Sequence, residues 1–149
     1  MQRLAYFVLS ALSFTGIFIA LHSPSRAHVQ GLFLSEKREI LSTVVGDILG
    51  DGTPVQVVKI RAGDRLFLEV YVPTHSGTRI LIDTITLSEN RDSYFSINGQ
   101  FTNLAVDDVD GDQRLEIVSP TVDHNLTAHL NVFKFNEETK LFQKVTKAY

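Results

Sequence analysis

The chain contains the stretch Val45-Gly46-Asp47-Ile48-Leu49-Gly50-Asp51, and a similar stretch, Val106-Asp107-Asp108-Val109-Asp110-Gly111-Asp112, follows about 61 residues later. A β-rich run comes after each copy, at Val55–Val58 and at Leu115–Val118. Each unit therefore reads as a strand, an acidic loop and three further strands. A period above about 50 residues with four strands per unit is typical of propeller blades, but two units are too few to close a ring.

The rest of the sequence predicts an all-β protein. Runs of Val, Ile, Leu, Phe, Tyr and Thr are cut by turn signals such as Asn98-Gly99, and only Leu34–Ile40 has a short helical pattern. We expect strands at residues 40–45, 55–61, 66–72, 79–87, 94–97, 101–106, 115–120, 128–135 and 141–145. We predict two propeller-blade-like four-stranded antiparallel units, at about residues 40–88 and 101–146, in an incomplete propeller or a sandwich-like packing. Assembly of several copies is a further expectation.

Composition narrows the class of protein. With 149 residues, 44% hydrophobic and 21% charged, the chain has the size and balance of one globular domain. The net charge of −3 and the lack of a Lys/Arg run argue against nucleic-acid partners and against adhesion to anionic membranes. The sequence has no cysteine, so stability must come from the core, from oligomerisation or from a metal.

The N-terminus has the pattern of a secretory signal peptide. A positive start at Met1-Gln2-Arg3 precedes an apolar run from Leu4 to Leu21, and Ser25-Arg26-Ala27 supplies small residues for cleavage. We expect residues 1–27 to be a signal peptide and residues 28–149 to be a secreted or periplasmic domain. The competing interpretation is an uncleaved membrane anchor, because the apolar run of about 18 residues is near the lower limit for a membrane span.

The second acidic loop predicts a calcium site. Carboxylates stand at loop positions one, three, five and nine, and the position-seven carbonyl supplies another oxygen; these ligands are Asp108, Asp110, Asp112, Glu116 and the carbonyl of Arg114. Calcium takes six to eight oxygens, which such a loop and water can provide. The alternative is a solvated acidic turn, which like-charge repulsion disfavours.

The first loop keeps fewer acidic residues. It retains Asp47 and Asp51, but Leu49 and Val55 replace two of the carboxylates. Two carboxylates are too few for a dedicated calcium cage. We therefore interpret this loop as a structural turn.

The pattern Asp-x-Asp-Gly-Asp-x-x-x-Glu-Ile between strands resembles the FG-GAP/VCBS repeats of integrin-like propellers and of many exported bacterial proteins. The resemblance covers about residues 40 to 146, and the second copy carries its specific motif. It places Asp108, Asp110, Asp112 and Glu116 on the family's ligand positions and Arg114 on its carbonyl ligand. It implies a calcium-stabilised scaffold that binds a protein or a glycan, with the first repeat degenerate.

Three functions stay open at this level. The leading hypothesis is a non-catalytic exported binding module stabilised by Ca²⁺. The second is a periplasmic hydrolase or accessory subunit that uses the acidic cluster, and the third is a small metal-free inhibitor or envelope protein. Asp123-His124 and His129 are a weaker candidate pair, because nothing supplies a third partner at a recognisable spacing.

Overall fold

The computed structural model describes residues 37–97 and 99–145, and within these residues the protein is all-β. The predicted signal peptide therefore lies outside the described residues. No helix among the described residues has the length and apolar character needed to cross a membrane. Of the stretch 34–40, where the sequence has a short helical pattern, the described residues 38–40 belong to a strand.

The first unit is a four-stranded antiparallel sheet in which each strand pairs with the next along the chain. Its strands are β1 (Arg38–Gly46), β2 (Val55–Ala62), β3 (Arg65–Pro73) and β4 (Arg79–Thr86). Gly63 turns the chain between β2 and β3 with a φ of 59°, a conformation that glycine adopts without steric cost. This is the four-stranded unit that the sequence predicts.

The second unit is built in the same way. It consists of β8 (Ala105–Asp107), β9 (Glu116–Val122), β10 (Ala128–Asn136) and β11 (Leu141–Lys144), again paired in chain order and antiparallel. A short strand, β5 (Arg91–Asp92), pairs with the other end of β9. Between the units, β6 (Phe95–Ile97) and β7 (Gln100–Thr102) form a separate hairpin.

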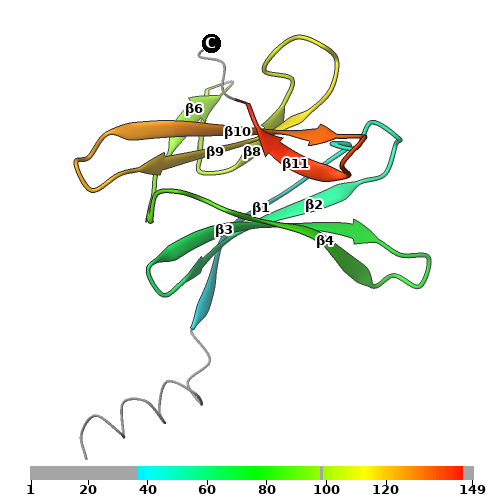
Figure 1. The fold of residues 1–149 in the computed structure, drawn as a ribbon, viewed down its shortest axis with the longest axis horizontal. Coiled ribbons are helices and arrows are strands. Elements are labelled where there is room, and N and C mark those ends of the chain that lie inside the picture. The colour runs from blue at the N-terminus through cyan, green and yellow to red at the C-terminus, as the bar shows by residue number, and fades with distance from the viewer. Residues whose placement is uncertain (1–36, 98, 146–149) are drawn as a thin grey trace, which may run out of the picture. The chain divides into compact units, whose positions relative to one another are not determined.

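The two sheets lie in layers, as Figure 1 shows, and the core fills the space between them. The first sheet contributes Val55, Val57, Leu66, Leu68 and Val70, and the second contributes Ile117, Phe133 and Phe142. Burying one such side chain fully is worth about 1.5–3 kcal/mol, so this layer is the main source of stability. The structure thus adopts a sandwich-like packing of two units.

The two units present opposite faces to this core. The sequence repeat aligns Val55 with Glu116. The strand pairings at the two loops agree with this alignment, because Val55 pairs with Gly46 and Glu116 pairs with Asp107. Val55 points into the core, whereas in the second unit the core residue is Ile117, the next residue along the strand. Since neighbouring residues of a strand point to opposite faces, Glu116 lies on the face that turns away from the first unit.

One predicted strand is interrupted. The sequence predicts a continuous strand at residues 101–106, but the structure has β7 and β8 there, separated by Asn103 and Leu104, which are both buried. The Asn103 side chain donates a hydrogen bond to Asp92 Oδ2 at 2.7 Å. The interruption lets these two residues turn inward, and strand periodicity alone does not indicate it.

A buried lysine joins the two units. Lys59 on β2 is fully buried, and its Nζ lies 2.6 Å from Asp92 Oδ1 on β5. The same ammonium donates to the carbonyl oxygens of Asn103 at 3.0 Å and Pro120 at 2.7 Å. Pro120 lies on β9 between the stretch that pairs with β8 and the stretch that pairs with β5. The Lys59 ammonium therefore donates to a carbonyl at a point where neither β8 nor β5 pairs with β9. Burial lowers the pKa of Lys59, and Asp92 opposes that shift.

Candidate metal centre

Both acidic loops have the same conformation. In the first, Asp47 accepts hydrogen bonds from the backbone N–H of Gly50 and of Gly52, each at 2.9 Å. In the second, Asp108 accepts the equivalent bonds from Gly111 at 2.7 Å and Gln113 at 2.9 Å. Thus one aspartate at the start of each loop organises the turn.

The backbone angles agree with this equivalence. Gly50 and Gly111 have φ values of 75° and 78°, and Gly52 and Gln113 have φ values of 83° and 69°. Gln113 therefore holds a left-handed conformation that a glycine adopts more easily. A second aspartate in each loop, Asp51 or Asp112, accepts the N–H of the residue two positions later. Hydrogen bonds alone account for the shape of the loops.

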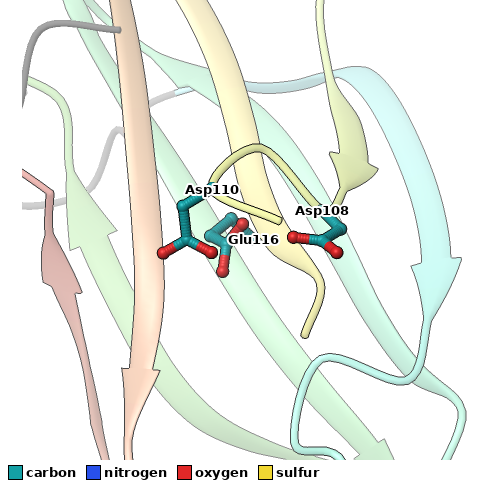
Figure 2. A group of neighbouring side chains, drawn as sticks. All are labelled: Asp108, Asp110 and Glu116. Atoms are coloured by element: carbon teal, nitrogen blue, oxygen red, sulfur yellow. The ribbon is translucent and has the colours of Figure 1, made fainter. Parts of the chain in front are cut away.

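The second loop differs from the first by carrying two extra carboxylates. Asp110 and Glu116 stand where the first unit has Leu49 and Val55. One carboxylate oxygen from each of Asp108, Asp110 and Glu116 lies within 4.8 Å of the other two. Figure 2 shows these three side chains beside the second loop. Two oxygens that bind one calcium ion at about 2.4 Å can lie at most about 4.8 Å apart, so these three side chains fit a common ion.

Glu116 is the buried member of this group. It begins β9 and exposes 0% of its surface. Its Oε2 accepts the backbone N–H of Val109 at 2.9 Å, but its Oε1 has no hydrogen-bond partner. A buried carboxylate oxygen without a hydrogen bond is unfavourable, and a directly bound cation is a ligand that would satisfy it.

Lys134 is the positive charge nearest to these oxygens. Its Nζ lies 2.7 Å from Asp110 Oδ2, 2.5 Å from Asp112 Oδ2 and 3.4 Å from Glu116 Oε1. The contact to Glu116 is an ion pair without a hydrogen bond. The two aspartates raise the pKa of Lys134, and the Lys134 ammonium in turn lowers the pKa of Asp112. The contacts with the two aspartates thus stabilise the charged form of Lys134.

The predicted ligands do not all converge. The structure brings together Asp108, Asp110 and Glu116, while Asp112 is the nearest partner of Lys134 rather than a member of the trio. The guanidinium of Arg114 pairs with Glu137 on the loop after β10, and this contact raises the pKa of Arg114. Glu137 is therefore the main partner of the Arg114 guanidinium, and Asp112 is a weaker electrostatic neighbour.

Sequence reasoning missed Lys134. It lies on β10, one position beyond Phe133, which pairs with Ile117, and this register brings it opposite Glu116. Both strands were predicted, but the register between them depends on the connecting loop, whose geometry the sequence does not reveal. A basic residue near the end of the predicted strand 128–135 was the available signal.

Asp123 and His129 form a second polar contact. His129 Nε2 lies 3.2 Å from Asp123 Oδ2, and the other oxygen of Asp123 accepts the N–H groups of Asn125 and Thr127. These bonds close the turn between β9 and β10. The pair therefore has a structural role in the hairpin.

Comparison with protein-family models, with curated proteins and with solved structures finds no match to the chain.

Proposed function

We propose that the chain is an exported, non-catalytic β-repeat module that binds one calcium ion in its second acidic loop and presents its surface to a protein or glycan partner. The observation that carries the calcium site is the buried Oε1 of Glu116, unpaired by hydrogen bonds and within 4.8 Å of ligand oxygens from Asp108 and Asp110. The export and the partner class rest on the N-terminal sequence pattern and on the resemblance to FG-GAP/VCBS repeats.

The comparison of the two loops supports a role for the extra carboxylates. The first loop keeps its shape with leucine and valine at the positions of Asp110 and Glu116. Those two carboxylates are therefore not needed to build the turn. They add like charges around a buried site, which a bound cation would neutralise more fully than the single charge of Lys134.

The ligand set follows from the geometry. Asp108, Asp110 and Glu116 supply carboxylate oxygens, and water completes a shell of six to eight oxygens. Asp108 already accepts three backbone N–H groups, so it retains about one free lone pair for an ion. Asp112 and the carbonyl of Arg114 complete the set that the family resemblance implies.

The ion pairs of the cluster with Lys134 support metal binding over acid–base catalysis. A hydrolase that used this cluster would need one carboxylic acid with a raised pKa. Lys134 instead lowers the pKa of Asp112, and it also pairs with Asp110. The hydrolase hypothesis predicts turnover that is lost in Asp110→Asn while the fold survives, whereas the binding module predicts no turnover.

Thermal unfolding tests the calcium site. The purified chain is melted in calcium, in magnesium and in chelator, alongside Asp110→Leu, which copies Leu49 of the first loop. An affinity typical of extracellular modules predicts about 1–2 kcal/mol of stabilisation at millimolar calcium. We expect this gain in the wild type and not in Asp110→Leu. Equal melting temperatures of the wild type in calcium and in chelator would contradict the site.

A further inference from the structure

The Lys134 ammonium lies beside two of the three carboxylates that could hold a cation in the second loop. It contacts Asp110 Oδ2 at 2.7 Å and lies 3.4 Å from Glu116 Oε1, and both side chains belong to the group that fits a common metal ion. A lone pair that accepts an ammonium hydrogen cannot also bind a metal ion. The lysine and a calcium ion therefore compete for the same two carboxylate side chains, Asp110 and Glu116.

The internal repeat shows that this lysine accompanies the carboxylates. The pair Gln56 and Tyr71 in the first unit corresponds to the pair Ile117 and Phe133 in the second. The residue that follows Tyr71, Val72, is therefore the equivalent of Lys134. Leu49 and Val72 both pack against the core, and Val55 is part of it. One unit thus has three apolar side chains where the other has two carboxylates and one ammonium.

The lysine can also leave the site. Its side chain is 28% exposed, while Glu116 beside it is fully buried. A lysine carries its charge on a flexible four-carbon stem, so its ammonium can turn to water without a change in the backbone. The buried Glu116 and the hydrogen-bonded Asp108 stay in place for an incoming ion.

We propose that Lys134 is an intramolecular competitor for calcium, which neutralises the carboxylates of Asp110, Asp112 and Glu116 in the metal-free protein and is displaced when the ion binds. This inference rests on the proposed calcium site and adds its regulation. The lysine keeps the empty loop from repelling itself and, for the same reason, weakens calcium binding. Calcium occupancy then changes the position of one positive charge on the outer face of the second unit.

The test compares Lys134→Met with a matched variant, Lys144→Met, which removes the same charge from an exposed position on the adjacent strand β11. Calcium affinity is measured by titration calorimetry on the purified chain at fixed ionic strength. Loss of the competing ammonium removes charge-assisted hydrogen bonds that calcium must break, so we expect Lys134→Met to bind calcium about tenfold more tightly. Lys144→Met is expected to match the wild type.

Stability in chelator gives a second readout, in which Lys134→Met is expected to have an unfavourable effect although it raises calcium affinity. Lys134→Met is expected to melt below the wild type in chelator, because the carboxylates lose their counter-charge, and to gain more from calcium than the wild type does. A direct readout is the ¹H–¹⁵N correlation of the Lys134 ammonium in NMR spectra. We expect its protons to be protected from solvent exchange in chelator and the correlation to be lost to fast exchange on addition of calcium.

The outcomes separate this inference from the proposed function. Calcium binding of the wild type together with equal or weaker binding of Lys134→Met would overturn the competition and leave the calcium site standing. Binding by Lys134→Met alone would support the competition and show that the lysine excludes calcium from the wild type. If neither protein binds calcium, both the site and the competition are wrong.

Discussion

Glu116 occupies in the second unit the position that Val55 occupies in the first, and both side chains are fully buried. Each residue begins the strand after its acidic loop and pairs with the last residue of the strand before it. Val55 packs in the core between the sheets, whereas Glu116 lies on the opposite face beside Lys134. The same backbone position thus serves packing in one unit and charge in the other.

This equivalence makes Glu116→Val an informative substitution. It replaces a buried carboxylate, one oxygen of which has no hydrogen bond, by the residue that the first unit tolerates there. The substitution removes a carboxylate that is costly to bury, and Lys134 keeps Asp110 and Asp112 as partners, so no buried charge is left uncompensated. We expect Glu116→Val to be at least as stable as the wild type in chelator and to gain nothing from calcium. Thermal unfolding in the two conditions measures both effects.

The control for this experiment is Glu116→Gln, which keeps the shape of the side chain and removes its charge. It is expected to lose calcium stabilisation as well. A loss of more than about 2 kcal/mol by Glu116→Val in chelator would mean that the hydrogen bond to Val109 anchors the loop, since an unsatisfied buried N–H costs about 1–3 kcal/mol.

The two loop-organising aspartates form a matched pair. Asp47 and Asp108 accept equivalent backbone hydrogen bonds, and removal of such a cap costs about 1–2 kcal/mol. We expect Asp47→Ala and Asp108→Ala to destabilise the protein by similar amounts in chelator. Only Asp108→Ala should lose calcium binding, as calorimetry would detect. Loss of calcium binding in Asp47→Ala would show that the first loop is not merely a turn.

Lys59 and Asp92 are predicted to be the most sensitive ion pair in the described part of the chain. Removing one partner of a buried pair leaves an uncompensated charge and costs about 3–5 kcal/mol. We expect Lys59→Ala to lose stability of this order in urea unfolding, because Lys59 is fully buried and also donates to two backbone carbonyls. The double variant Lys59→Met/Asp92→Asn should recover part of that loss; no recovery would mean that the carbonyl contacts dominate.

The turn at Asp123 predicts a dependence of stability on pH. The backbone N–H of Thr127, and then the contact with His129, hold the pKa of Asp123 below its ordinary value of 3.8. The folded state therefore favours the carboxylate more than the unfolded chain does. This stabilisation is complete above about pH 3.8 and is lost as the pH falls through the lower folded-state pKa.

Acid unfolding of Asp123→Asn measures that contribution. The asparagine keeps an oxygen for the turn but does not titrate, so we expect its stability to fall less than that of the wild type as the pH drops below about 3.8. The hydrogen bonds of Thr53 also lower the pKa of the exposed Asp51 carboxyl, and this contribution is common to both proteins. Parallel acid curves for the wild type and Asp123→Asn would contradict the prediction.

Local pattern was sufficient for much of the fold. β-Branched runs and turn residues indicated the strands of both four-stranded units, because a strand between short turns is encoded by nearby residues. The acidic loops were also readable, since Asp47 and Asp108 act through hydrogen bonds to residues three and five positions later. The two-residue strand β5 was missed, because it exists only through its pairing with β9.

The sequence by itself determined the all-β class, the order of strand and acidic loop in each unit, and the carboxylates of the second loop, because all of these depend on residues close together in the chain. Only the tertiary structure decided which face of each unit meets the other. That choice placed Val55 in the core and Glu116 outside it, and the register of β9 and β10 brought Lys134 to the acidic loop. Face selection and register depend on the burial of residues far apart in sequence, which no local pattern contains.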